Sequence, residues 1–101
     1  MTAGEGRALL GLSVYADDVR LGTVAGVLVD DRADCVLGVD VNVSWGGGTR
    51  FLPWAAANVV GHGVHGNAFS FLGAEEADFY VRRGARRLSR AGDVSAAPAR
   101  G

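Results

Sequence analysis

The chain has 101 residues and a formal net charge of −1 at pH 7; hydrophobic residues make up 49% of it and charged residues 21%. That length suits one domain, and the composition excludes the polar, highly charged class of disordered chains. The balanced charge provides no overall attraction to nucleic acid or acidic membranes, so we expect no nucleic-acid partner and treat any such attraction as local.

The numbers of glycines and cysteines limit the possible fold classes and the possible covalent cross-links. The chain has 16 glycines, which favour tight turns over long helices, and a single cysteine, Cys35, which excludes an internal disulfide. Cys35 stands at the start of an apolar strand, a setting typical of a small buried residue. The sequence does not open with a basic start and an apolar run, and it contains no stretch of about eighteen apolar residues. We therefore expect a cytoplasmic protein without a transmembrane segment.

The first third of the chain predicts a flexible start and two strands. Residues 1–7 have no apolar periodicity and are expected to be flexible. The apolar run 9–15 predicts a strand that ends at the turn-forming pair Asp17 and Asp18. The β-branched run 21–29 predicts a second strand. Because both faces of this strand are apolar, the helix or a second chain is expected to cover one of them.

The alternation between residues 35 and 43 is the clearest pattern in the sequence and predicts the third strand. Its odd-numbered residues, from Cys35 to Val43, are apolar and are expected to face the core. Its even-numbered residues, Asp40 among them, are expected to lie mostly toward solvent. The glycines at 46–48 predict a turn after the strand, because consecutive glycines lose too much entropy inside a regular element.

The second half of the chain predicts three more short strands, over residues 49–52, 59–63 and 67–72. Phe69 and Phe71 are expected to share one face of the last of these strands, because side chains two residues apart point the same way. Repeated short strands at this spacing are typical of a barrel.

A helix is predicted over residues 74–84, where acidic residues come early and arginines late and Gly84 suits a left-handed cap. The predicted fold class is all-β: a small barrel of about six short antiparallel strands with a short C-terminal helix and a disordered tail. The predicted organisation is a flexible N-terminus at 1–7, a β domain at 8–73, the helix at 74–84 and an arginine-rich flexible tail at 85–101.

Five short motifs resemble a known family. In chain order they are Leu10-Gly11 with Val14-Tyr15, Leu21-Gly22-Thr23-Val24, Leu37-Gly38-Val39-Asp40-Val41, Phe51-Leu52-Pro53-Trp54 and Val59-Val60-Gly61. In this order they resemble the PRC-barrel family over residues 8 to 72. The resemblance implies a compact β-barrel and a non-enzymatic adaptor or assembly role, often as a homodimer. Such domains occur in a photosynthetic reaction-centre subunit, in a ribosome-maturation factor and as stand-alone small proteins. The chain departs from many members at Gly26, where they carry an acidic residue.

The histidines His62 and His65 are weak candidates for metal ligands. Residues three apart in a strand point to opposite faces, so we expect a surface hairpin here and predict neither a metal nor a cofactor. The metal hypothesis stays open for a dimer, because two such pairs brought together would supply four histidines. No serine stands in a nucleophile-elbow motif, and the glycine-rich turn lacks the lysine of a phosphate loop, so we expect no enzyme.

An arginine run and three aromatic residues are the candidate partner-binding residues. The arginines are Arg82, Arg83, Arg86, Arg87 and Arg90. The aromatic residues are Phe79, Tyr80 and Trp45. The run suits an acidic protein surface, a phosphate or an anionic lipid head group, which leaves peripheral membrane contact open. A solvated C-terminal extension is the simpler alternative.

The sequence and the resemblance together favour a non-enzymatic protein-interaction or adaptor module that forms a homodimer with an unidentified protein partner. The alternative is an RNA-linked ribosome-assembly factor, in which the arginine run would meet phosphate; the net charge counts against it. A small-ligand or metal-binding barrel that uses the two histidines is a third hypothesis.

Overall fold

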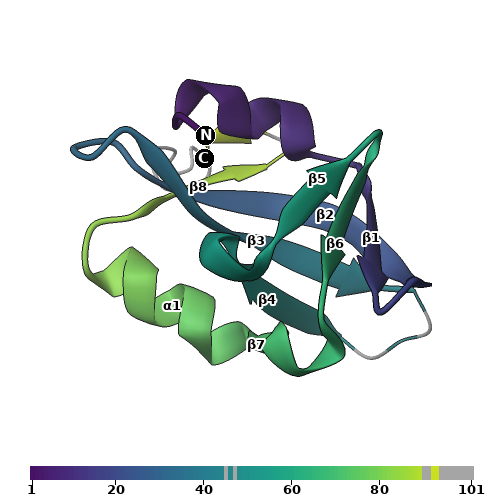
Figure 1. Ribbon diagram of the computed structural model, residues 1–101. Helices are drawn as coiled ribbons and strands as arrows, with labels where there is room; N and C mark the ends of the chain where they lie inside the picture. The colour runs from purple at the N-terminus through teal and green to yellow at the C-terminus, as the bar shows by residue number, and fades with distance from the viewer. Residues whose placement is uncertain (45, 47, 90–91, 94–101) are drawn as a thin grey trace.

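The computed structural model describes residues 1–44, 46, 48–89 and 92–93. The described elements are three 3₁₀-helices, one α-helix and nine strands (Figure 1). In chain order they are η1 (Gly4–Leu9), β1 (Ser13–Ala16), β2 (Val19–Asp30), β3 (Cys35–Val43), β4 (Thr49–Pro53), η2 (Trp54–Ala56), β5 (Asn58–Val60), β6 (Gly63–Gly66), η3 (Ala68–Ser70), β7 (Leu72–Gly73), α1 (Ala74–Arg82), β8 (Arg86–Ser89) and β9 (Gly92–Asp93).

The strands form one curved, barrel-like sheet. They follow the order β5-β6-β1-β2-β3-β4-β7, and β8 pairs with β2 and β9. Most neighbouring strands are antiparallel, but β1 and β6 run parallel, with Val14 opposite Val64. Within the described residues no ladder joins β5 to β7, so the sheet is not closed. The predicted mainly β class with one short helix is confirmed; the structure differs in having more strands than predicted and one parallel pair.

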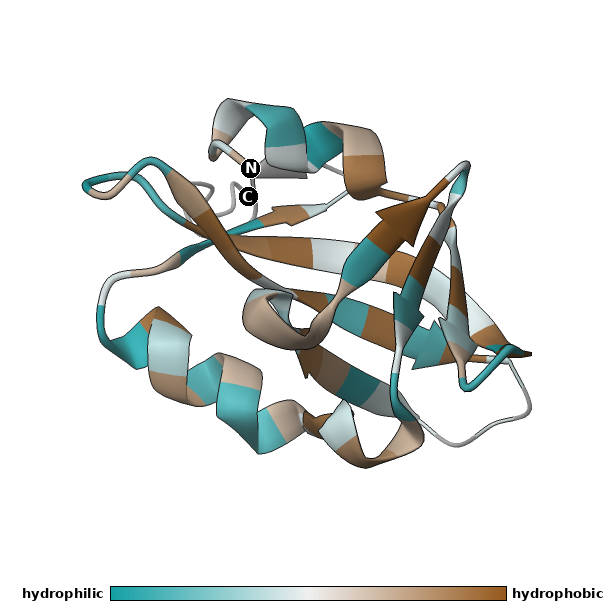
Figure 2. Ribbon diagram, viewed as in Figure 1, coloured by the Kyte–Doolittle hydropathy of each residue, from teal (hydrophilic) through white to brown (hydrophobic). Residues whose placement is uncertain are grey.

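The main core is formed by side chains from six strands and from η1. Its fully buried members include Val14, Val27, Val39, Leu52 and Val64. Figure 2 shows hydrophobic residues concentrated along the strands and hydrophilic ones in the hairpin between β2 and β3. Burial of these valines and leucines supplies the main driving force for folding, at roughly 25 cal/mol for each Å² of apolar surface removed from water.

A second, smaller core lies between α1 and the sheet, on the side opposite η1 (Figure 1). Leu28, Phe51 and Ala77 are its buried members. Both faces of β2 are therefore covered by the chain itself, because Leu28 faces α1 while Val27 and Val29 face the main core. The helix accounts for the apolar second face of this strand that the sequence analysis noted.

A β-bulge reverses the predicted alternation at the start of β3. Leu28 pairs with Gly38 and Val29 with Val36, which leaves Leu37 as an extra residue. Val36 consequently packs in the main core and Leu37 packs on the α1 side, the reverse of the prediction. The alternation in the sequence carries no mark of the bulge, because the extra residue is as apolar as its neighbours.

Asp40 was expected to lie toward solvent, and the structure contradicts this: Asp40 is only 6% exposed. Strand β8 lies on the other side of β2 from β3, and its Arg87 side chain reaches across β2 and donates from Nε to Asp40 Oδ2 at 2.8 Å. A buried carboxylate needs such a charged partner. The periodicity of β3 could not indicate this partner, because Arg87 belongs to a segment that was expected to be flexible.

The N-terminal residues form η1 in place of the loosely held terminus predicted for 1–7. Ala3 and Leu9 are buried in the main core. A side chain added at Gly6 would come within 3.2 Å of the Val36 side chain, so η1 packs closely on the sheet. The backbone N–H of Ala3 donates to Asp34 Oδ1 at 3.1 Å, which fixes the terminus to the β2–β3 hairpin. The predicted strand from residue 9 accordingly begins only at Ser13.

The C-terminal helix ends as the sequence indicated. Gly84 has φ +104, and the N–H groups of Gly84 and Ala85 donate to the carbonyl oxygens of Val81 and Tyr80, each at 3.0 Å. These bonds form a glycine-based helix cap. The predicted flexible tail is strand β8 over Arg86–Ser89, paired with β2, and the tail beyond Asp93 lies outside the described residues. No helix in the described part of the chain is long and apolar enough to span a bilayer.

The strand predicted over 67–72 is instead the 3₁₀-helix η3 followed by the short strand β7. The Asn67 side chain accepts a hydrogen bond from the N–H of Phe69 at 2.8 Å and so starts the turn. Phe69 and Phe71 do not share a face: Phe69 is 93% exposed, whereas Phe71 packs against the main core. An asparagine cap overrides the aromatic strand pattern here.

Candidate functional site

The end of α1 and its C-cap residue carry four of the predicted partner-binding residues: Phe79, Tyr80 and Arg82 lie in the helix, and Arg83 is the C-cap. Phe79 is 42% exposed, and the guanidinium carbon of Arg83 lies 4.8 Å from the centroid of its ring. Tyr80 meets Phe79 edge to face at 5.6 Å between centroids and contacts the buried Phe51 at 5.7 Å. Tyr80 therefore anchors an exposed pair, Phe79 and Arg83, on a packed helix.

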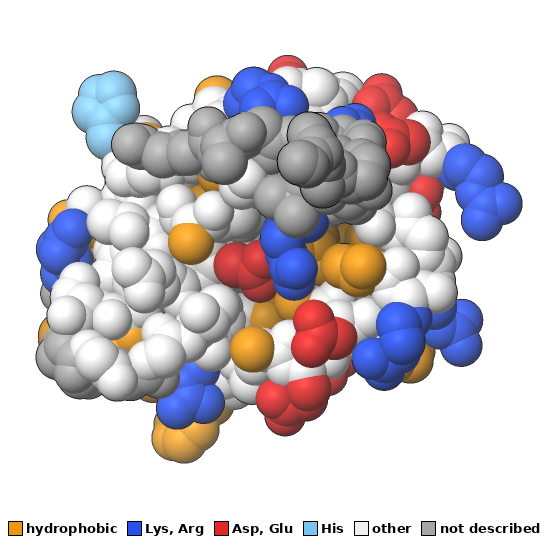
Figure 3. All heavy atoms as spheres, turned by 180° about the vertical axis from the view of Figure 1, so that it is seen from behind, with side chains coloured by type: hydrophobic (Ala, Val, Ile, Leu, Met, Phe, Trp, Pro, Cys, Tyr) orange, Lys and Arg blue, Asp and Glu red, His pale blue; other side chains and the backbone are white. Residues whose placement is uncertain are grey.

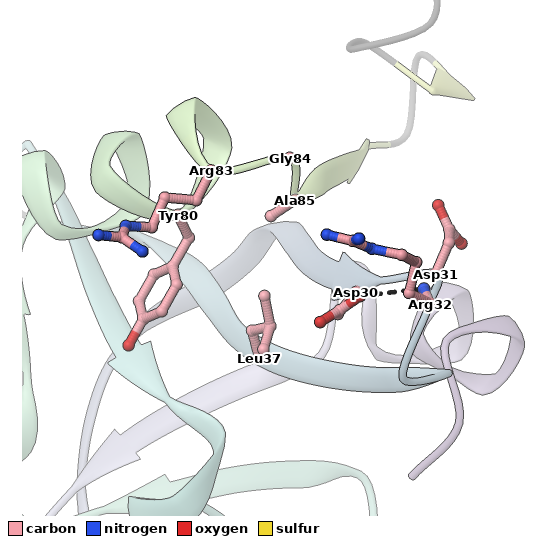
Figure 4. A pocket seen from close by; sticks show the side chains of 8 residues that line it. All are labelled: Asp30, Asp31, Arg32, Leu37, Tyr80, Arg83, Gly84 and Ala85. Atoms are coloured by element: carbon pink, nitrogen blue, oxygen red, sulfur yellow. Dashed lines mark hydrogen bonds between the residues drawn. The ribbon is translucent and has the colours of Figure 1, made fainter.

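A pocket of about 270 Å³ lies between this end of α1 and the hairpin that joins β2 to β3 (Figure 4). This helix-end pocket is lined by Asp30, Asp31, Arg32, Leu37, Tyr80, Arg83, Gly84 and Ala85. Figure 4 shows Tyr80 and Arg83 at one end, Arg32 at the other and Leu37 between them. The pocket thus joins two segments that are far apart in the sequence.

Both carboxylates of the helix-end pocket are occupied by partners in the protein itself. Asp30 Oδ1 accepts from the backbone N–H groups of Arg32 at 3.0 Å and Ala33 at 3.2 Å, which folds the hairpin turn. The two oxygens of Asp31 accept from Nε and Nη2 of Arg86 at 2.7 and 2.8 Å. The hydrogen bond from Arg86 lowers the pKa of Asp31.

The guanidinium groups of Arg32 and Arg83 have no acidic partner among the described residues. Neither forms an ion pair with any residue that the structure describes, although Arg83 stacks on Phe79. Since Asp30 and Asp31 are already hydrogen-bonded, the positive charges at the two ends of the pocket remain available to an anionic group from outside.

Comparison with models of known protein families shows which family the chain belongs to. A PRC-barrel domain model matches residues 1–69, more than half of the chain. The chain belongs to the PRC-barrel family. No curated protein matches it. The PRC-barrel is a fold of the protein-interaction and assembly type.

The helix-end pocket combines the PRC-barrel domain with a C-terminal addition. Asp30, Arg32 and Leu37 come from the part that the PRC-barrel model matches, whereas Tyr80 and Arg83 come from α1, which follows it. The pocket exists only because α1 packs on the outside of the sheet next to the β2–β3 hairpin.

The arginines of the predicted run lie in different environments in this PRC-barrel protein. Arg86 pairs with Asp31 and Arg87 with Asp40, while Arg82 and Arg83 are exposed at the end of α1. On the face seen in Figure 3, basic side chains are dispersed among acidic and neutral ones. Two arginines of the run thus have structural roles, and its role in partner binding stays a prediction.

The ion pair of Arg87 with Asp40 lies beside a second hollow of about 320 Å³, which Thr49, Ala74 and Asp78 also line. Burial raises the pKa of Asp40 above its usual 3.8, and the charge of Arg87 opposes that rise. Because the carboxylate of Asp40 is already paired with Arg87, we assign this hollow a structural role.

The two histidines lie in different environments. His65, on β6, stacks on Tyr15 of the neighbouring strand β1, with 4.7 Å between ring centroids and 12° between ring planes. His62 is exposed in the turn between β5 and β6. In the ranges that the structure covers, no group of three or more histidine, cysteine or acidic residues is arranged to hold a metal ion. Metal binding by this pair stays untested.

The sequence analysis did not identify Asp31, Arg32 and Leu37 as pocket residues. The signal was present as adjacent acidic and basic residues in one turn, but nothing indicated that α1 would pack next to it. The candidates Trp45 and Arg90 lie outside the described residues.

Proposed function

We propose that this PRC-barrel protein is a non-enzymatic, cytoplasmic protein-interaction module, an adaptor or assembly factor that works as a homodimer and docks on a protein partner through the end of α1. The observation that carries this proposal is the exposed Phe79, held between Tyr80 and Arg83, two residues that line the helix-end pocket. Aromatic and arginine residues beside a pocket are the residues that dominate binding energy in protein interfaces.

The rigidity of Phe79 supports this role. Its ring contacts Tyr80 on one side and the Arg83 guanidinium on another, so little side-chain freedom remains to be lost on binding. Complete burial of such an apolar side chain is worth roughly 1.5–3 kcal/mol. Phe79 is 42% exposed, so a partner that covers it gains less than half of this, without first ordering the surface.

The edge strand β5 supports the homodimer. In the described part of the chain, β5 pairs only with β6 and leaves its other edge open. Val59 is 43% exposed and Val60 63%, and β5 carries no charged side chain. Open edges are usually protected by charges or proline, so an uncharged apolar edge suits pairing with another strand. Two copies of β5 in antiparallel orientation would form a self-complementary two-fold interface.

The surroundings of the arginines favour a protein partner over the RNA-linked alternative. A nucleic-acid surface gathers basic side chains along one stripe. Here Arg86 and Arg87 are committed to carboxylates of the protein itself, and the acidic residues Asp30 and Asp31 lie beside Arg32 and Arg83.

The test is affinity purification of the tagged full chain from its own host, with and without nuclease, followed by mass spectrometry of the bound proteins. The proposal predicts a defined protein complex that survives nuclease treatment. Enrichment of ribosomal components that nuclease removes would contradict it in favour of the RNA-linked alternative.

A further inference from the structure

We propose that the helix-end pocket binds an acidic peptide segment of the partner, in which carboxylates flank an apolar residue. This inference rests on the proposed interaction function and specifies the chemistry of the partner. The carboxylates would meet Arg32 and Arg83, and the apolar side chain would lie on Leu37, Tyr80 and Ala85.

The charge of the pocket selects an anionic occupant. Four charged side chains line it, and its two carboxylates are already bound, Asp30 to backbone N–H groups and Asp31 to Arg86. Arg32 and Arg83 have no acidic partner in the ranges that the structure describes. A basic peptide would place like charges next to these guanidinium groups, whereas a carboxylate would form charge-assisted hydrogen bonds with them.

The separation of the two arginines predicts the pattern of the segment. They come from different parts of the chain and stand at opposite ends of the pocket: Arg32 extends over it from the hairpin, and the Arg83 side chain runs back along α1 beside Tyr80 (Figure 4). One carboxyl group at each end therefore fits better than a single group between them. Between the two arginines the pocket presents the apolar surface of Leu37 and Ala85, with the Tyr80 ring beside them at the Arg83 end, to the residue between the two carboxylates.

The size and rigidity of the pocket suit a peptide side chain. Its volume of about 270 Å³ lies just below the roughly 300–1,000 Å³ of small-molecule sites, so it fits one apolar side chain better than a large cofactor. The turn at Gly84 is fixed by the helix-cap bonds from Gly84 and Ala85, which keeps this wall of the pocket in place before binding.

The test compares two double variants that each remove two positive charges. Arg32→Gln/Arg83→Gln changes the pocket, and Arg7→Gln/Arg50→Gln changes two exposed arginines on η1 and β4. None of these four arginines forms an ion pair with a described residue, so both double variants should fold. Thermal melting would verify this. Each full-length protein selects binders from a displayed library of short random peptides.

The expected result is enrichment of peptides with aspartate or glutamate on both sides of an apolar residue. This enrichment should occur with the unaltered protein and with Arg7→Gln/Arg50→Gln, and not with Arg32→Gln/Arg83→Gln. Replacement of the acidic residues by glutamine or asparagine in the best peptide should weaken its binding at least about tenfold in a titration.

Absence of any enriched peptide, enrichment of basic or uncharged peptides, or acidic binders that ignore Arg32→Gln/Arg83→Gln would overturn the inference. Binding of single-stranded RNA through these two arginines, with no acidic peptide bound, would overturn it as well. Capture of a nuclease-resistant protein complex that is insensitive to Arg32→Gln/Arg83→Gln would refute the pocket's role while leaving the interaction function in place.

Discussion

The Nε of Arg87 lies 2.8 Å from Oδ2 of Asp40, and this ion pair joins β8 to the middle of β3. The side chain of Asp40 is 9% exposed and that of Arg87 30%. The pair is therefore largely removed from water, unlike the pair of Arg86 with Asp31, whose side chains are 31% and 55% exposed.

Loss of one partner of the buried pair should destabilise the fold. Arg87→Gln leaves the carboxylate of Asp40 buried without a charged partner, and we expect the free energy of unfolding to fall by about 3 kcal/mol. Urea denaturation measures this change. Asp31→Asn, which breaks the exposed pair, is the matched control and should cost much less. Equal losses in the two variants would show that burial does not distinguish the pairs.

The raised pKa of Asp40 predicts a specific dependence of stability on pH. In the window between the usual value of 3.8 and the raised pKa, the folded protein binds more protons at this site than the unfolded chain. Stability at this site therefore rises as pH falls through the window. Urea unfolding of the unaltered protein and of Asp40→Asn over this range isolates the effect, because other groups cancel in the difference. The unaltered protein should gain stability relative to Asp40→Asn on acidification; a relative loss would mean that the pKa of Asp40 is lowered.

Close packing at Gly38 predicts that even a methyl group is not tolerated there. A Cβ at this position would overlap the ring of Phe51 and lie 2.7 Å from the carbonyl oxygen of Leu52. We expect Gly38→Ala to reduce the free energy of unfolding by about 3 kcal/mol, measured by urea denaturation. The control is Gly4→Ala, since nothing lies within 4 Å of a Cβ at Gly4. A change at Gly38 no larger than that at Gly4 would contradict the packing.

The open edge of β5 predicts how the homodimer can be broken. Val60→Lys places a charge on this edge strand and should shift the protein from dimer to monomer, because a charged side chain on an edge strand opposes its pairing with another strand. Val19→Lys, at another valine that is 61% exposed, should leave the dimer intact. Sedimentation equilibrium measures the mass against the 10.4 kDa of one chain. An unaltered protein that stays at 10.4 kDa at all concentrations would exclude the homodimer.

The sequence alone predicted the structure correctly where interactions between neighbouring residues determine it. The alternation of β3 from Val39 to Val43, the helix with its cap at Gly84 and the five family motifs are all carried by neighbouring residues. Leu37 shows the limit, because a bulge of one apolar residue changes which face each side chain takes without changing the composition.

The parts that could not be predicted depend on contacts between distant segments. Arg87 and Asp40 are 47 residues apart, and Arg86 and Asp31 are 55 apart. A run of arginines near the C-terminus therefore resembled a flexible, solvated tail, although two of them bind carboxylates on the sheet. Residues 1–7 were misjudged for a similar reason, since Ala3 and Gly6 are small and become buried only against the sheet.

The most direct measurement of the interaction function is a paired comparison of Phe79→Ser and Phe69→Ser as baits for the partner complex. Both phenylalanines are exposed, Phe79 at 42% beside the helix-end pocket and Phe69 at 93% on η3. Docking through the end of α1 predicts that Phe79→Ser captures much less of the nuclease-resistant complex than the unaltered protein, while Phe69→Ser captures an equal amount. Full capture by Phe79→Ser would contradict the proposed docking surface.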